Sequence, residues 1–330
     1  MKQHPTYPLL FSLHAMIVLL LLTVLNNRTE AQQANRPFLR ELSFVTDNDN
    51  YDLGFTDRYY TNGFFLRLHW VHDSAGASAT VRRIRRAELA HKTYNPVLNR
   101  TTRFAVLREM DRPYAGWLYA SRGETRIYPR HSVLQLDASL GVMGPAAGGR
   151  EVQNSWHNVF GLPEALAWDQ QVRNSIDLSL RAAYYQAVVS DPSEFTSIHL
   201  FSRVTAGTIL NNAAIGLLYK TGFIRSEATS GYWSAQLGQV QTRPLEWMFY
   251  FEPTLEYQLY NATVQGSLLR PDKGPFTTGI RPWVVQTALG VLATGNRLGL
   301  RVGYTLRGRE GEQMKKGEHW GTLGLSYRFQ

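Results

Sequence analysis

The sequence has 330 residues and no cysteine, which excludes disulfide bonds and cysteine-ligated metals. Lysine and arginine outnumber aspartate and glutamate by 35 to 26, a formal net charge of +9 at pH 7. A basic chain could bind nucleic acid, but for an exported protein an anionic membrane surface is the better fit, and no nucleic-acid partner is expected.

Residues 1–31 are predicted to be a secretory signal peptide. Lys2 precedes an apolar run from Leu9 to Leu25, and Thr29-Glu30-Ala31 predicts cleavage after Ala31. The competing interpretation is a retained membrane anchor. Residues 32–330 are then a single mature domain. They contain no apolar run near the ~20 residues that a spanning helix needs, so a place in the membrane would require a β-barrel.

Apolar and polar side chains alternate along most of the mature sequence. Phe64 and Leu66 fall on one face of a predicted strand, whereas Arg67 and His69 fall on the other. A wall between lipid and a polar lumen has this pattern. By the same parity, Thr61 is predicted to face the lumen.

The same pattern recurs about twelve times, which predicts an all-β fold: a transmembrane antiparallel β-barrel of about 12 strands. A soluble β-sandwich would also alternate, but the strands are long and aromatic residues gather near their ends, as in interfacial girdles. The predicted strands are 38–46, 60–70, 82–92, 114–128, 133–142, 176–184, 198–206, 214–223, 246–260, 279–294, 298–306 and 321–329.

One stretch, residues 144–169, does not alternate. Gly148-Gly149 opens a predicted helix, and Gly161 followed by Pro163 closes it. Within it, Gln153 and His157 are four residues apart, so their side chains share one face beside an apolar stripe. They could be a catalytic base and its positioning partner, or a surface pair on a loop helix. The stripe comprises Val152, Trp156, Val159 and Phe160.

Three other polar clusters interrupt the strands. The run from Asp47 to Asn50 offers hard oxygen ligands that suit Ca²⁺, although an Asx-rich turn would look the same. Residues 56–63, TDRYYTNG, contain Thr61 and could equally be a loop-to-strand junction. Residues 111–116, DRPYAG, are interpreted as a structural turn in which Asp111 could pair with Arg112.

Together these clusters could hydrolyse an ester. His157 would take a proton from water, and Gln153 would orient the ring or the water. A Ca²⁺ ion held by Asn48, Asp49 and backbone oxygens would polarise the carbonyl, and Thr61 would help to stabilise the oxyanion.

The sequence resembles the outer-membrane lipid A 3′-O-deacylase family (LpxR-type). The resemblance covers residues 38–175 and rests on Asn48-Asp49, TDRYYTNG at 56–63, DRPYAGWLY at 111–119 and GPAAGGREVQNSWHNVFGLPEALAWDQQ at 144–171. It implies a twelve-stranded barrel with a short extracellular-loop helix at the active site. It also implies Ca²⁺-dependent removal of the 3′ acyloxyacyl group from lipid A.

Carried over to this sequence, the resemblance implies metal ligands at Asn48 and Asp49, and catalytic residues at Thr61, Gln153 and His157. The family's functional lysine has no match, because residues 94–101 read YNPVLNRT. Arg100 is the nearest cation there and is a possible oxyanion or phosphate contact. Because the reach and geometry of arginine differ from those of lysine, this departure would alter the oxyanion arrangement or the substrate preference.

The resemblance also implies partners and a location. The expected partners are lipid A or lipopolysaccharide and the bacterial outer membrane, with the active site facing the cell surface. The sequence does not determine the oligomeric state, and a monomer is expected. Two other functions stay open: a non-catalytic outer-membrane barrel, either a pore or a structural protein, and a phospholipid esterase on the same scaffold.

Overall fold

The structure, a computed structural model, describes residues 37–52, 58–72, 82–97, 102–190, 195–240 and 245–330. The predicted signal peptide lies outside these residues. No described helix is long and apolar enough to cross a membrane.

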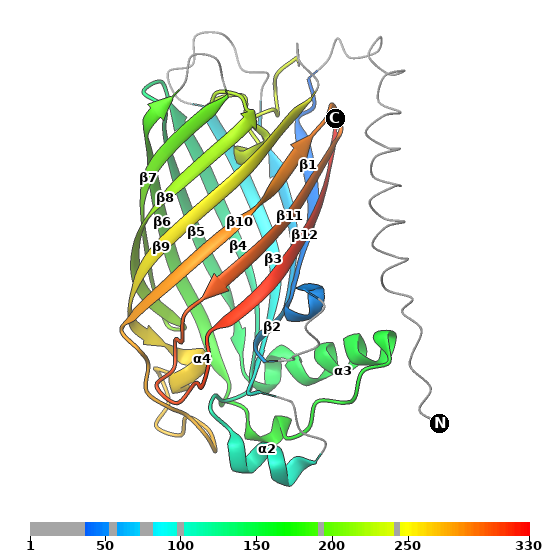
Figure 1. Cartoon of the computed structure of the whole chain (residues 1–330), viewed down its shortest axis with the longest axis vertical. Helices are drawn as coiled ribbons and strands as arrows, with labels where there is room; N and C mark the ends of the chain where they lie inside the picture. Colours follow the sequence, from blue (N-terminus) through cyan, green and yellow to red (C-terminus); the bar gives the residue numbers. More distant parts are fainter. Residues whose placement is uncertain (1–36, 53–57, 73–81, 98–101, 191–194, 241–244) are drawn as a thin grey trace.

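Twelve antiparallel strands form one closed barrel, in which each strand pairs with its neighbours in sequence and β1 pairs with β12 (Figure 1). The prediction of a barrel of about 12 strands is confirmed. The strands are β1 (Arg40–Asn48), β2 (Tyr59–Trp70), β3 (Arg82–Asn95), β4 (Ala115–Tyr128), β5 (Ser132–Met143), β6 (Ser175–Ser190), β7 (Thr196–Gly207), β8 (Leu210–Phe223), β9 (Glu246–Asn261), β10 (Trp283–Thr294), β11 (Leu298–Arg307) and β12 (Glu318–Phe329).

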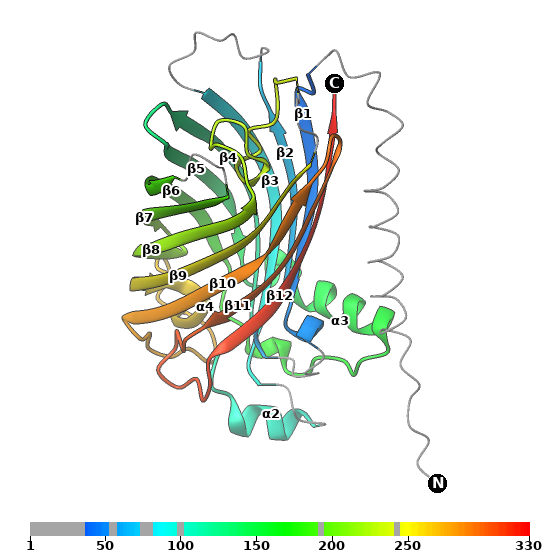
Figure 2. The same cartoon turned by 45° about the horizontal axis from the view of Figure 1, so that its top comes forward.

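The short elements lie beyond the strand ends. The α-helices are α2 (Arg103–Glu109), α3 (Gly149–Phe160) and α4 (Ala262–Gln265), and the 3₁₀ helices are η1 (Asp49–Asp52), η2 (Pro145–Ala147), η3 (Trp168–Gln170) and η4 (Gly231–Trp233). Figures 1 and 2 place α2, α3 and α4 at the end of the barrel opposite the C terminus. We call this end the helix end and the other the terminal end.

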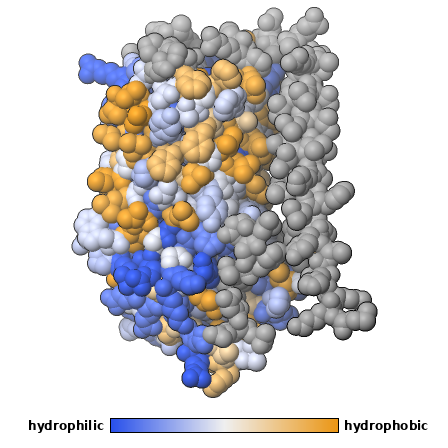
Figure 3. Space-filling view, viewed as in Figure 1, coloured by the Kyte–Doolittle hydropathy of each residue, from blue (hydrophilic) through white to orange (hydrophobic). Residues whose placement is uncertain are grey.

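Alternation along the strands separates an apolar exterior from a polar lumen. On β6, Leu178 and Leu180 are exposed on the outer face, whereas Ser179 and Arg181 line the lumen. Apolar residues gather over the strands, and hydrophilic residues gather toward the helix end (Figure 3). This distribution suits a wall that faces lipid over most of its height.

The lumen is filled rather than open. At the terminal end, residues 224–240 fold inward and bury Trp233 against Tyr185 at a ring distance of 5.0 Å. Ser234 donates to Glu41 at 2.8 Å. Toward the helix end, Arg112 is fully buried, pairs with Glu310, and donates from Nη2 to Thr263 at 2.7 Å, while other lumen residues line a cavity of about 330 Å³. The barrel interior therefore acts as a polar core.

Candidate active site

The loop helix α3 lies against the outer face of the barrel wall at the helix end (Figures 1 and 2). Trp156 of α3 contacts two rings, that of Phe64 on β2 at 5.6 Å and that of Tyr51 on η1 at 6.5 Å. Farther along the wall, His91 Nε2 of β3 lies 2.9 Å from the carbonyl oxygen of Ala147. These contacts bring η1 and α3 together on one face, which we call the outer-wall site.

Glycine punctuation sets the ends of α3, as predicted. Gly148 precedes the helix with φ of 67°, and Gly161 follows it with φ of 66°. Both values lie in the left-handed region that favours glycine. The chain turns back at once, because Leu162 N donates to the carbonyl oxygen of His157 at 2.8 Å.

A pair of glycines lets the helix approach the wall closely. A Cβ atom on Gly149 would lie 2.8 Å from the Cα of Gly116 on β4 and 2.7 Å from the ring of Trp168. Real Cβ atoms do not come so close to backbone. Any larger residue at 149 would therefore push α3 away from β4 and from the residues that fix its side chains.

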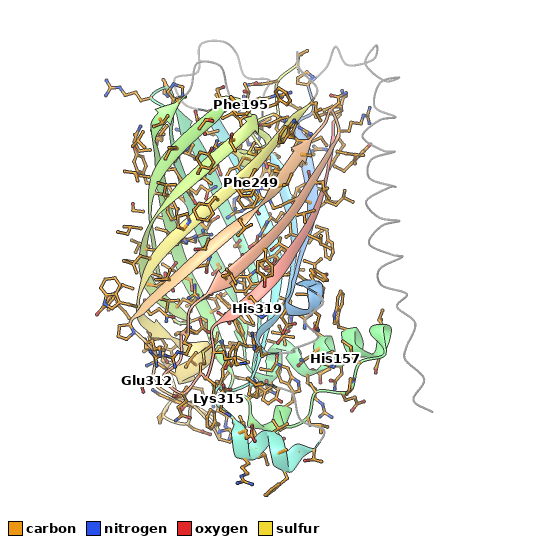
Figure 4. The ribbon with its side chains drawn as sticks, in the orientation of Figure 1. His157, Phe195, Phe249, Glu312, Lys315 and His319 are labelled. Carbon is orange, nitrogen blue, oxygen red and sulfur yellow. The ribbon has the colours of Figure 1, made fainter. Side chains whose placement is uncertain are left out.

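His157, on α3 at the helix end of the barrel (Figure 4), is almost fully buried. Its Nδ1 bonds the carbonyl oxygen of Pro163, and because a carbonyl only accepts, Nδ1 carries the hydrogen. In a neutral ring Nε2 is then the nitrogen that takes up a proton. The turn after α3 thus selects the tautomer that a general base needs.

Gln153 is fully buried one turn before His157. Its Oε1 accepts a hydrogen bond from Trp168 Nε1 at 3.0 Å. Trp168 packs in turn on Tyr114, with ring centroids 4.9 Å apart. The side-chain amide of Gln153 is therefore held in one orientation, and in that orientation it could position a water molecule or the substrate.

Asn48 is the last residue of β1, Asp49 is the first of η1, and both are buried. Asn48 Oδ1 accepts from Asn50 N at 2.7 Å, and Asn48 Nδ2 donates to Asn62 Oδ1 at 2.5 Å. Asp49 Oδ2 accepts from Arg58 N at 2.7 Å. Because Asp47 lines the lumen, Asn48 faces outward, on the same side of the wall as α3.

The donors gathered here fit Ca²⁺. Asn48, Asp49 and Asn50 present amide and carboxylate oxygens, the hard ligands that this ion takes. Asn50 Oδ1 is buried and accepts no hydrogen bond within the described part of the chain. Among the described residues no group of three or more His, Cys, Asp or Glu side chains is placed to hold a metal. Amide and backbone oxygens would therefore supply most of the ligands.

Thr61 does not face the lumen as predicted. Tyr60 and Phe65 both line the lumen, which an uninterrupted alternation cannot produce. The register of β2 with β3 shifts between Tyr60 and Asn62, leaving Thr61 as the extra residue of a β-bulge. Its hydroxyl bonds Asn95 Oδ1. The bulge turns Thr61 toward the outer-wall site, next to Asn62 and its partner Asn48.

The predicted pairing of Asp111 with Arg112 is wrong. Asp111 Oδ2 accepts a hydrogen bond from Tyr59 OH at 2.6 Å, whereas Arg112 pairs with Glu310 and lies 4.4 Å from the Tyr94 ring. Neighbours in a strand-like turn point to opposite sides, so each finds its partner elsewhere. The interpretation of DRPYAG as structural still agrees with these contacts.

Arg100 lies outside the described residues. The next described segment carries Arg103, whose Nη2 donates to Asp169 Oδ2 at 2.6 Å and ties α2 to η3. Hydrogen bonding to the Arg103 guanidinium lowers the pKa of Asp169 to about 2. On η1, burial raises the pKa of Tyr51 above its ordinary value. Both groups keep their usual charge at neutral pH.

Two residues of the outer-wall site were missed in the sequence. Arg58 Nη2 lies 2.7 Å from Nε2 of His319 on β12, and the two residues are 261 positions apart. Figure 4 shows His319 on β12, toward the helix end of the barrel. Only closure of β1 on β12 brings them together, and no local pattern in the sequence signals it.

The comparisons agree with this architecture. The family profile described as "Outer membrane protein LpxR" matches residues 15–329. Among solved structures, LpxR from Salmonella typhimurium is similar, with a TM-score of 0.71 at 18% identity over 88% of this chain and 100% of that one. At this identity the likeness shows the barrel fold. No curated protein sequence matches the chain.

Two autotransporter domains are more distant. The translocator domain of NalP from Neisseria meningitidis has a TM-score of 0.42 at 10% identity, covering 96% of this chain and 98% of that one. The β domain of the Bordetella autotransporter BrkA has a TM-score of 0.40 at 9% identity, covering 90% and 99%. Scores this low carry no argument about this chain.

Proposed function

This chain belongs to the LpxR family of outer-membrane proteins, and we propose that it is an esterase that removes the 3′-linked acyloxyacyl chain of lipid A. The observation that carries the proposal is the hydrogen bond from His157 Nδ1 to the carbonyl of Pro163, on a helix whose Trp156 contacts Tyr51 of η1, the helix that begins at Asp49. A buried histidine in a fixed tautomer can act as a general base, and nearby oxygen ligands can hold a metal ion. A hydrolase active site combines these two features.

In the proposed reaction, His157 Nε2 takes a proton from a water molecule as the water oxygen attacks the ester carbonyl carbon. Thr61, turned outward by the β-bulge, would move its hydroxyl hydrogen from Asn95 Oδ1 to the developing oxyanion. The carbon–oxygen bond to the sugar then breaks, and the imidazolium returns its proton to the 3′ hydroxyl. Gln153 keeps the water or the ring in place.

A bound Ca²⁺ ion would polarise the ester carbonyl, with Asn48, Asp49 and neighbouring oxygens as its ligands. The oxygen-only donor set and the buried Oδ1 of Asn50 support this assignment. Arg100, which lies outside the described residues, is proposed as a contact for the oxyanion or for a lipid phosphate.

The outer-membrane location gives the site an orientation. An even number of strands puts both ends of the barrel chain at the terminal end, which faces the periplasm in bacterial outer-membrane barrels. We therefore place the helix end at the cell surface, where the lipid A leaflet lies. Residues 224–240 fill the terminal end of the lumen, which favours an enzyme over a pore.

The test is mass spectrometry of lipid A from a strain with hexa-acylated lipid A that expresses this protein. Loss of the 3′ chains, abolished by His157→Ala and by EDTA, is the expected result. Unchanged lipid A in cells that hold a correctly folded barrel would overturn the proposal. Fatty acids released from phospholipids instead would point to a phospholipid esterase.

A further inference from the structure

The outer-wall site contains a cation that the proposed reaction does not use. We propose that the Arg58 guanidinium, positioned by His319, binds a phosphate monoester of the substrate headgroup. This inference rests on the proposed function, because it identifies what else the same site recognises.

Arg58 is fixed at two points beside the metal-binding candidates. Its backbone N donates to Asp49 Oδ2 at 2.7 Å, and its side-chain Nη2 lies 2.7 Å from His319 Nε2. Glu318 and Trp320, the neighbours of His319, line the lumen, so His319 faces outward. The guanidinium therefore lies on the outer face of the wall, next to η1.

The contact with His319 does not neutralise Arg58. A guanidinium has only donors, so His319 Nε2 must accept, and the imidazole is then neutral. Within the described residues no carboxylate forms an ion pair with the Arg58 side chain, and its Nε is buried without a hydrogen-bond partner. Arg58 keeps a full positive charge and at least one buried donor.

Three other arginines of the described barrel differ from Arg58, because each has a carboxylate partner. Arg67 pairs with Glu88, Arg112 with Glu310, and Arg307 lies 2.9 Å from Glu256. Removing a charge from water is costly unless an anion compensates it. Arg58 is half-buried, lies beside Asp49 and has no carboxylate partner among the described residues. It is therefore suited to bind an anion that arrives with the substrate.

The chemistry of the donors selects the class of anion. Arginine presents a planar fork that matches phosphate oxygens with two parallel hydrogen bonds. His319 holds one Nη, which orients the fork and lowers the entropy lost on binding. A phosphate monoester on a lipid headgroup would meet this fork at the membrane surface, close to the ester that His157 would attack.

Equilibrium binding in the His157→Ala background separates this proposal from catalysis. The full-length protein in detergent is titrated with bisphosphorylated lipid A, with enzymatically dephosphorylated lipid A, with a phosphatidylglycerol micelle and with inorganic phosphate. We expect the bisphosphorylated form to bind at least ~10-fold more tightly than the dephosphorylated form, as for a charge-assisted hydrogen bond. Arg58→Gln should abolish that ratio, and Arg58→Lys should restore part of it.

The matched control is Arg103→Gln, which removes a cation already paired with Asp169 at the same end of the barrel and should keep the ratio. As a positioning residue, His319 should behave differently: His319→Leu should lower the ratio and His319→Gln, which retains an acceptor, should restore it. A ratio that survives Arg58→Gln would overturn the proposal, as would equal weakening for both lipids. Tight binding of inorganic phosphate or phosphatidylglycerol alone would identify a general anion site and overturn the assignment to the headgroup monoester.

Discussion

The lumen and the outer-wall site are both polar, yet they are built in opposite ways. In the lumen, charged side chains form ion pairs: Arg307 lies 2.9 Å from Glu256, and Arg328 lies 3.7 Å from Glu41. On the outer wall, neutral amides, a hydroxyl and two imidazoles lie near one buried carboxylate, Asp49, and the Arg58 side chain has no carboxylate partner among the described residues. A count of buried charges would therefore select the lumen, whereas the groups suited to ester hydrolysis lie outside it. The paired charges of the lumen compensate one another, whereas the polar groups of the outer wall are available for chemistry.

The largest expected effect is at His157. His157→Ala should lower deacylation by on the order of 10³-fold, because general-base catalysis is lost. The barrel should still show heat-modifiable migration on gels, since His157 lies outside the strands. His131→Ala, at the terminal end, is the control and should retain activity. Equal loss in both variants would contradict a specific role for His157.

Removal of the carboxylate at the end of β1 should come next. Asp49→Asn should lower activity by about 10²-fold and raise the Ca²⁺ concentration needed for half-maximal rate, because the only charged ligand of the proposed site is lost. Calcium titrations of wild type and variant measure this shift. Full activity of the wild type in EDTA would show that the reaction needs no divalent ion.

Displacing α3 without changing any catalytic group should lower the rate of deacylation by up to ~10²-fold, because a shift of about 1 Å in the position of the catalytic groups can have an effect of this size. Gly149→Val does this, because its side chain would meet Gly116 and Trp168. Gly161→Asn is the matched control: it stands at the other end of α3, where a Cβ meets nothing within 4 Å, and asparagine tolerates a positive φ. If the rates of both variants equal that of wild type, the helix position is irrelevant to the reaction.

The smallest effect on activity is expected in the lumen. Arg112→Met removes one of the two arginines that pair with the buried Glu310 and Glu318 and leaves only Arg307, which should lower the free energy of unfolding by about 3–5 kcal/mol. Activity per folded molecule should stay near that of wild type. Urea unfolding followed by tryptophan fluorescence measures the first quantity. Adding Glu310→Gln to Arg112→Met should recover part of the stability, and a further loss would contradict the pairing.

Local patterns in the sequence were enough to predict the strands and α3, because alternation and glycine punctuation act over a few residues. The orientation of Thr61 could not be predicted, since a single inserted residue at a bulge reverses the parity of everything before it. Arg112 with Glu310 and Arg58 with His319 are pairs that only barrel closure creates. The resemblance supplied the site residues, whereas the placement of the site on the outer face came from the register.

The most direct test of the account uses purified protein in detergent, with Ca²⁺ and hexa-acylated lipid A, and measures the released 3′ acyloxyacyl chain by mass spectrometry. Wild type and Arg112→Met should release it at similar rates per folded molecule, while His157→Ala should release almost none. Release by His157→Ala at the wild-type rate, or loss of release in folded Arg112→Met alone, would contradict the assignment of chemistry to the outer wall and structure to the lumen.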